Sequence, residues 1–173
     1  MSLDDIRMLV LDVDGVLTDG KIVFTESGEL IKAFHVQDGT GIKFWHRAGR
    51  QSAVISGRES STVERRCREL GIEHVYQGMK DKTPALESLL ARTKLDLREL
   101  AYVGDDLVDL PIMHRVGFPV AVANARPEVR EAARYVTRAR GGEGAVREVV
   151  ELLLRRQGLW DGIMTRYRTG NES

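Results

Sequence analysis

The stretch Met8-Leu9-Val10-Leu11-Asp12-Val13-Asp14-Gly15 joins a continuous apolar run to two carboxylates that stand two residues apart. A run in which every side chain is apolar is typical of a parallel strand that is buried on both faces of a sheet. In open α/β sheets, ligands bind at the carboxyl ends of such strands. Asp12 and Asp14 are therefore predicted to lie at the ligand-binding edge of a parallel sheet.

Apolar runs and helical segments alternate along the rest of the chain. The further predicted strands are Ala53 to Ile55, His74 to Tyr76, Leu100 to Val103, Val120 to Ala123 and Tyr135 to Thr137. Three predicted helices span Thr40 to Ala48, Ala85 to Lys94 and Ala145 to Arg156, the second of them after the cap Thr83 and the first-turn Pro84. A fourth helix begins with a capping box at Ser61 to Glu64 and ends at Gly71. A fifth helix begins at Arg126-Pro127. This alternation predicts the α/β class with a doubly wound, Rossmann-like parallel sheet.

Residues 21–36 break the alternation and are predicted to form a β-hairpin around the turn Glu26-Ser27-Gly28-Glu29. An isolated hairpin is marginally stable in water, so this one is expected to pack against another surface, for which a partner subunit is the natural candidate. The chain between Gly20 and Lys82 is too short to hold a separate cap domain. We expect one domain over residues 1–160, followed by a tail over residues 161–173 that lacks periodicity and is mobile in isolation.

Composition excludes several classes of protein. The chain has 173 residues with 26 Lys or Arg and 26 Asp or Glu, so its formal net charge is zero. A nucleic-acid binder usually needs a basic surplus, and a membrane span needs about 18 consecutive apolar residues, which this sequence lacks. Its acidic beginning does not resemble a signal peptide, and the single Cys67 excludes an intrachain disulfide. We therefore expect a cytoplasmic protein with no nucleic-acid or membrane partner.

Polar residues that follow the predicted strands are expected to meet at one edge of the sheet. They are Asp12, Asp14, Ser56, Lys82, Asp105, Asp106 and Asp109. Carboxylates at this range repel one another by several kcal/mol unless a cation or a proton intervenes. Oxygen ligands combined with an anionic substrate favour Mg²⁺ as that cation.

This ordered set of motifs resembles that of the haloacid dehalogenase superfamily of phosphotransferases: Asp12-Val13-Asp14-Gly15, Ser56, Lys82, and Gly104-Asp105-Asp106 with Asp109. The resemblance implies that Asp12 attacks phosphorus to form an aspartyl-phosphate. It implies that Asp14 protonates the leaving alkoxide and then activates water. Ser56 and Lys82 would stabilise the phosphoryl oxygens.

The same resemblance implies a set of Mg²⁺ ligands. They are the side chains of Asp12 and Asp105 and the backbone carbonyl of Asp14. Asp106 and Asp109 would orient these ligands.

Two further segments are similar to those of a narrower family, the 3-deoxy-D-manno-octulosonate 8-phosphate phosphatases of lipopolysaccharide biosynthesis. They are the hairpin with His35-Val36-Gln37-Asp38-Gly39, and Gly141 to Glu148. The resemblance implies a homotetramer in which hairpins assemble, neighbouring subunits close the site and the tail reaches an adjacent site. The substrate contacts that it implies are Asp14, His35, Val36, Gln37, Asp38, Gly39, Lys43, Arg58, Arg66 and Lys82.

Other interpretations stay open at this point. Phosphatases of nonulosonate 9-phosphates tend to carry an acidic residue where Arg58 stands, so Arg58 favours the eight-carbon substrate. A receiver-like phospho-acceptor module would also need a strand-end aspartate, Mg²⁺, a hydroxyl and a lysine, but it lacks a second carboxylate in the position of Asp14. Residues 141–144 are equally well a phosphate-cradling loop or a flexible connector.

Overall fold

The computed structural model describes residues 2–169, and six parallel strands form its main sheet in the order β5-β4-β1-β6-β7-β8. The strands are β1 (Met8–Leu11), β4 (Gln51–Ile55), β5 (His74–Tyr76), β6 (Leu100–Gly104), β7 (Phe118–Ala121) and β8 (Tyr135–Val136). The predicted doubly wound sheet is confirmed. Strand β7 begins two residues earlier than predicted and includes Pro119, whose carbonyl accepts a hydrogen bond from the backbone N–H of Arg134.

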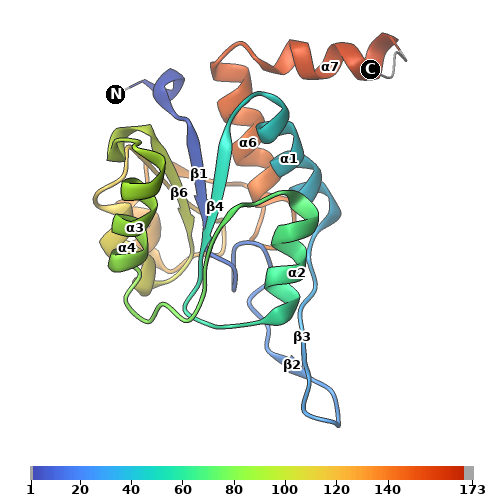
Figure 1. Cartoon of the computed structure of the whole chain (residues 1–173), viewed down its shortest axis with the longest axis vertical. Helices are drawn as coiled ribbons and strands as arrows, with labels where there is room; N and C mark the ends of the chain where they lie inside the picture. The colour runs from blue at the N-terminus through green and yellow to red at the C-terminus, as the bar shows by residue number, and fades with distance from the viewer. Residues whose placement is uncertain (1, 170–173) are drawn as a thin grey trace.

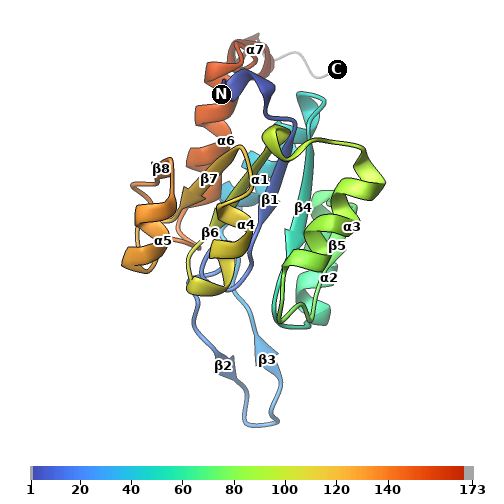
Figure 2. The same ribbon diagram turned by 90° about the vertical axis from the view of Figure 1, so that its left-hand side faces the viewer.

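Helices cover both faces of this sheet (Figures 1 and 2). One face carries α1 (Val36–Arg47), α2 (Ser61–Leu70) and α6 (Ala145–Arg156). The opposite face carries α3 (Thr83–Thr93) and α4 (Leu110–Met113), and α4 packs against α5 (Pro127–Ala132). Three 3₁₀ turns complete the connections: η1 (Leu3–Asp5), η2 (Leu97–Glu99) and η3 (Leu107–Asp109). None of the helices within residues 2–169 is both long and apolar enough to cross a membrane.

Strand β1 is the centre of the core. All of its residues are buried, and it pairs with β4 on one side and with β6 on the other. The residues that follow β1, β4 and β6 therefore come together at one edge of the sheet. Burial on both faces explains why every position of β1 is apolar.

The beginnings of three helices differ from the predictions. Helix α1 begins at Val36 rather than at the predicted Thr40. Its first turn contains Gly39, and because glycine is a poor helix former, the helical signal in the sequence is weak there. An added Cβ at this position would lie 2.3 Å from the Arg66 side chain. The predicted capping box at Ser61 was wrong, because Ser60 is the N-cap and makes no side-chain cap. Thr83 is not the cap of α3, whose N-cap position is Lys82.

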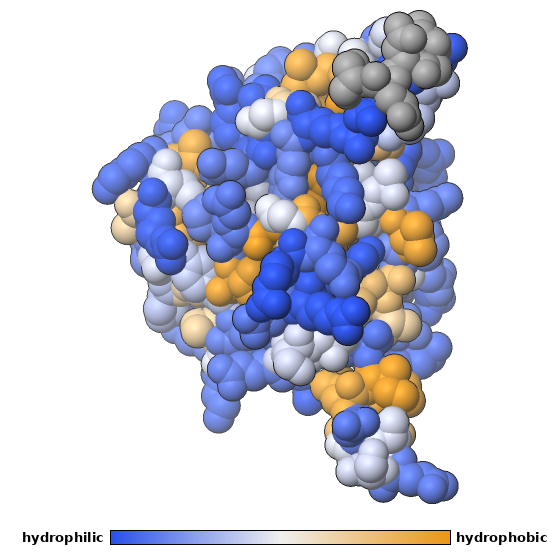
Figure 3. All heavy atoms as spheres, turned by 45° about the vertical axis from the view of Figure 1, so that its right-hand side comes forward, coloured by the Kyte–Doolittle hydropathy of each residue, from blue (hydrophilic) through white to orange (hydrophobic). Residues whose placement is uncertain are grey.

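The predicted hairpin is confirmed and projects from the sheet edge (Figure 2). Its antiparallel strands are β2 (Val23–Phe24) and β3 (Leu30–Ile31). Figure 3 shows apolar surface where the hairpin leaves the body of the molecule, and Phe24 is 62% exposed. This exposure agrees with the expectation that the hairpin packs against another surface.

The C-terminal stretch that showed no periodicity forms helix α7 (Trp160–Thr169), whereas residues 170–173 lie outside the described part. The buried Trp160 ring lies 6.0 Å from the ring of Phe44, and the Arg47 guanidinium donates a hydrogen bond to Tyr167. These tertiary contacts stabilise the helix, although its sequence shows no helical periodicity. Helix α7 lies at the end of the molecule opposite the hairpin (Figure 1).

Candidate active site

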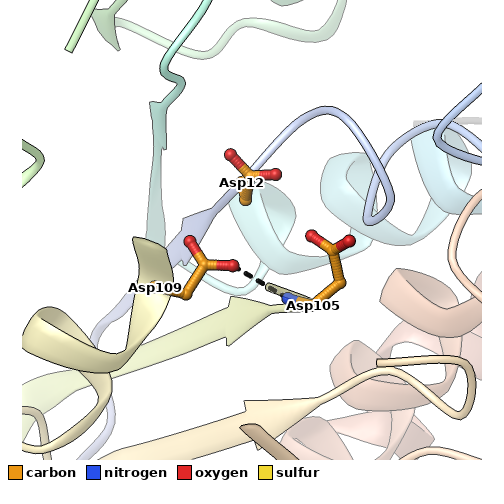
Figure 4. A group of neighbouring side chains, drawn as sticks. All are labelled: Asp12, Asp105 and Asp109. Carbon is orange, nitrogen blue, oxygen red and sulfur yellow. Dashed lines mark hydrogen bonds between the residues drawn. The ribbon is translucent and has the colours of Figure 1, made fainter. Parts of the chain in front are cut away.

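The carboxyl ends of β1, β4 and β6 surround a cleft of about 570 Å³. It is lined by Asp12, Asp14, Gly20, Ile22, Ser56, Gly57, Arg58, Met79, Lys80, Lys82, Asp105, Asp106 and Val108. Figure 4 shows the carboxylates of Asp12, Asp105 and Asp109 close together at this edge of the sheet. The structure thus brings together the acidic residues, the serine and the lysine that the sequence predicted to meet.

Lys82 links two of these carboxylates. Its Nζ donates to Asp12 Oδ1 at 2.5 Å and to Asp109 Oδ1 at 2.7 Å, and its side chain is almost fully buried. Burial lowers the pKa of a lysine, but the two carboxylates outweigh that effect and the pKa of Lys82 is raised. Lys82 stands at the N-terminus of α3, and from there its charged side chain reaches Asp12 at the end of β1.

Asp109 accepts hydrogen bonds on both of its oxygens. Lys82 Nζ and Tyr102 Oη, the latter at 2.6 Å, donate to Oδ1. The backbone N–H groups of Asp105 and Asp106 donate to Oδ2 at 2.8 and 3.2 Å. Because both oxygens are engaged in this way, Asp109 is suited to hold the loop after β6 and Lys82 in place. The orientation of Mg²⁺ ligands by Asp109 stays a prediction.

Tyr102 is a site residue that the sequence analysis missed. Its side chain is completely buried in β6, and its Oη lies between Lys82 and Asp109. A buried tyrosine hydroxyl almost always has a hydrogen-bond partner. A tyrosine in an otherwise apolar strand two residues before Gly104 was therefore the signal that could have identified it.

Three neighbouring carboxylates could together bind a divalent cation. Asp12, Asp105 and Asp109 each offer an oxygen, and these oxygens lie within 4.8 Å of one another. Burial, followed by the charges of Asp12 and Asp109, raises the pKa of Asp105 to about 8. Burial also raises the pKa of Asp12 to about 6, against the opposing effect of Lys82. Because one ammonium does not balance this cluster and Asp109 is already engaged, Asp12 and Asp105 are the side chains suited to bind Mg²⁺.

The Asp14 carboxylate lies between two cations. Lys32 Nζ forms an ion pair with its Oδ1, and Arg58 Nε lies 4.0 Å from its Oδ2. Lys32 follows strand β3 of the hairpin and is a second residue that the sequence analysis missed. No periodicity links it to Asp14, since the contact forms where the chain returns from the hairpin to the edge of the main sheet.

Ser56 and Asp106 complete the predicted set around the cleft. Ser56 is buried directly after β4, and its Oγ accepts a hydrogen bond from the backbone N–H of Arg58 at 3.3 Å. The Asp106 carboxylate accepts from the N–H of Leu107 at 2.8 Å and caps the short helix η3. Both side chains line the cleft, and their roles in the reaction stay predictions.

Seven of the predicted substrate contacts lie outside this cleft in the single chain: His35, Val36, Gln37, Asp38, Gly39, Lys43 and Arg66. Asp38 is 1% exposed and accepts from the backbone N–H groups of Gly144 and Arg147, so it caps helix α6 from α1. The Arg66 guanidinium lies over the Phe34 ring at 5.8 Å. Contact between these residues and a substrate stays a prediction.

The glycine-rich loop 141–144 packs on the turn that follows Asp14. The N–H of Gly142 donates to the carbonyl of Val16 at 2.9 Å. An added Cβ on Gly141 would lie 1.6 Å from the carbonyl oxygen of Gly15, and Gly142 has a φ of +70°. The backbones therefore approach so closely that side chains are excluded, and the loop braces the turn that follows Asp14.

Comparisons with known proteins extend the resemblance beyond the motifs. The family model for haloacid dehalogenase-like hydrolases matches residues 71–149. Over 158 residues the chain is 50% identical to the 3-deoxy-D-manno-octulosonate 8-phosphate phosphatase KdsC of Escherichia coli K12, covering 91% of this chain and 84% of the relative.

Two solved structures are similar over nearly the whole chain. A probable YrbI family phosphatase from Pseudomonas syringae has a TM-score of 0.93 at 50% identity, covering 95% of this chain and 94% of that one. A 3-deoxy-D-manno-octulosonate 8-phosphate phosphatase from Moraxella catarrhalis, in complex with a magnesium ion, a phosphate ion and KDO, has a TM-score of 0.93 at 41% identity, covering 95% of both chains. The similarity therefore extends over nearly the whole described fold.

Proposed function

The chain belongs to the 3-deoxy-D-manno-octulosonate 8-phosphate phosphatases of the haloacid dehalogenase-like hydrolases, and from this membership we infer its substrate and its mechanism. It is a phosphoric monoester hydrolase that releases phosphate from 3-deoxy-D-manno-octulosonate 8-phosphate, with Mg²⁺ as its cofactor. The observation that carries this conclusion is 50% identity to a phosphatase of that name over 84% of its length. The pathway is the biosynthesis of lipopolysaccharide.

Asp12 is the nucleophile of the proposed mechanism. Lys82 holds its Oδ1, which leaves Oδ2 for attack on phosphorus. As the Asp12 O–P bond forms, the bond between phosphorus and the sugar oxygen breaks and an aspartyl-phosphate results. When bound by Asp12, Asp105 and the carbonyl of Asp14, Mg²⁺ neutralises charge on the phosphoryl oxygens. Lys82 and the Ser56 hydroxyl contribute further stabilisation of that charge.

Asp14 moves the proton in both half-reactions. Its carboxyl proton passes to the departing sugar oxygen in the first, and its carboxylate then takes a proton from the water that attacks the aspartyl-phosphate in the second. General acid catalysis of this kind contributes about 10²–10⁴-fold to a rate. The Asp14 side chain lines the same cleft as Asp12, which supports this assignment.

Arg58 and the hairpin support the proposals about substrate and assembly. The Arg58 guanidinium is exposed at the cleft, where it is suited to bind the substrate carboxylate. The exposed apolar side chains of the hairpin, among them Phe24, support assembly into a homotetramer. Contacts from His35 to Gly39, Lys43 and Arg66 would then be made with the site of a neighbouring subunit. We also propose a cytoplasmic location and the division into a domain over residues 1–160 and a tail over residues 161–173.

Phosphate release from a panel of sugar phosphates, with Mg²⁺ and with a chelator, tests the proposed function. We expect rapid Mg²⁺-dependent turnover of the octulosonate 8-phosphate. Faster turnover of a nonulosonate 9-phosphate would contradict the substrate and the argument from Arg58. If no phosphate ester is turned over while Asp12 still takes up phosphate, the chain is a phospho-acceptor module instead.

A further inference from the structure

Lys32 is a buried charge on an otherwise exposed element. Its side chain is 2% exposed, whereas Ile31, its neighbour in the hairpin, is 49% exposed. Lysine is almost never buried unless its ammonium is paired, because removing the charge from water is costly. The partner here is Asp14, 18 residues earlier in the chain. The chain that leaves the hairpin thus places the ammonium group of Lys32 next to Asp14.

The ion pair makes the two oxygens of Asp14 different. Lys32 occupies Oδ1, whereas Oδ2 lies toward Arg58, which lines the cleft. The terminal torsion of an aspartate is soft, so the plane of its carboxyl group is set by its hydrogen-bond partners. An ammonium on Oδ1 therefore fixes the plane and leaves Oδ2 as the oxygen that can exchange a proton with a substrate.

We propose that Lys32 is a positioning residue for the acid step. This inference rests on the proposed roles of Asp12 and Asp14. As the bond from Asp12 to phosphorus forms and the bond from phosphorus to the leaving oxygen breaks, the proton on Asp14 Oδ2 passes to that oxygen. Lys32 holds Oδ2 in line for the transfer, so the hairpin completes the active site of its own chain.

The leaving group of the substrate separates this role from a structural one. A sugar alkoxide needs a proton to leave, whereas p-nitrophenolate leaves without one. The kcat/KM value reports the steps up to release of the alcohol, and breakdown of the aspartyl-phosphate is common to both substrates. A positioning defect at Asp14 therefore lowers kcat/KM for the sugar phosphate much more than for p-nitrophenyl phosphate.

The experiment compares Lys32→Met, Lys32→Gln and Lys32→Arg on both substrates. We expect Lys32→Met to lower kcat/KM for the sugar phosphate about 10–100-fold, a part of the general acid contribution, and for p-nitrophenyl phosphate less than about threefold. Lys32→Arg should restore most of the loss, and Lys32→Gln should fall between the two. If Lys32→Met does not fold, the ratio of the two substrates in Lys32→Gln and Lys32→Arg decides.

Lys21→Met is the matched control. Lys21 lies at the other base of the hairpin, is 77% exposed and pairs with Asp19 rather than with Asp14. Its variant should leave the ratio of the two kcat/KM values unchanged. An equal loss on both substrates in the Lys32 variants, or no loss, would overturn the proposed positioning. Wild-type protein that hydrolyses neither substrate would instead overturn the proposed function.

Discussion

Asp105→Asn is expected to abolish Mg²⁺-dependent turnover and yet to stabilise the Mg²⁺-free protein at pH 8. Burial and the charges of Asp12 and Asp109 raise the pKa of Asp105 to about 8. An aspartate in an unfolded chain has a pKa of about 3.9. The folded protein therefore holds this proton more tightly than the unfolded chain does.

The sign of the pH dependence follows from this difference. A carboxyl whose pKa rises on folding costs no stability below the unfolded pKa, and its full cost is reached above the folded pKa. The free energy of unfolding of the Mg²⁺-free protein should thus fall between about pH 4 and pH 8. Four pKa units at about 1.4 kcal/mol each set an upper limit of about 6 kcal/mol for Asp105. Water at the cleft mouth screens part of the repulsion, so we expect Asp105→Asn to gain about 2–4 kcal/mol at pH 8.

Denaturant unfolding in a chelator at pH 5 and pH 8 measures this effect. The advantage of Asp105→Asn should shrink toward pH 5, and saturating Mg²⁺ should stabilise the wild type much more than the variant. Asp106→Asn, at the exposed neighbouring carboxylate, is the control and should change stability far less. An Asp105→Asn protein that is no more stable than wild type at pH 8 without Mg²⁺ would refute the repulsion argument.

Three further variants test the arrangement around the cleft. Tyr102→Phe removes a buried hydroxyl that is hydrogen-bonded to charged groups, so it should lower the free energy of unfolding in denaturant by about 1.5–3 kcal/mol. The control Tyr135→Phe, at a part-exposed tyrosine, should lower it by about 1 kcal/mol or less. Gly141→Ala should lower kcat at least tenfold by displacing the turn after Asp14, whereas Gly162→Ala, with open space around it in α7, should leave kcat unchanged; equal activities would contradict the bracing role. Asp38→Ala should lower the midpoint of thermal unfolding by about 2–8 °C through loss of a cap on α6, and an unchanged midpoint would contradict that assignment.

The sheet and most of the acidic site could be predicted because they depend on local signals. Each strand is a short apolar run, and Asp12, Ser56 and Asp105 follow directly after three such runs. Parallel pairing then brings their ends together without any further information from the sequence. The same logic explains why strand ends were predicted better than helix beginnings, which depend on individual caps.

The residues that were missed depend on contacts between distant segments. Lys32 reaches Asp14 only because the chain after β3 returns to the edge of the main sheet. Asp38 was predicted as a site residue, but not as the cap of a helix that begins more than 100 residues later. The hydroxyl of Tyr102 has its partners at the start of α3 and in η3. Helix α7 is held by the packing of its own Trp160 ring against Phe44 of α1. No pattern of periodicity within a segment contains this information.

The braced turn after Asp14 also has a consequence for synthesis on the ribosome. Asp12 and Asp14 are synthesised well before the glycines that brace the turn after them, which stand at positions 141 and 142. Strand β1 must meanwhile wait for β6 before its second edge is paired. The turn after Asp14 therefore stays without its brace until residues 141 and 142 have been synthesised. We expect nascent chains released before residue 142 to be inactive, because the turn after Asp14 then lacks its brace.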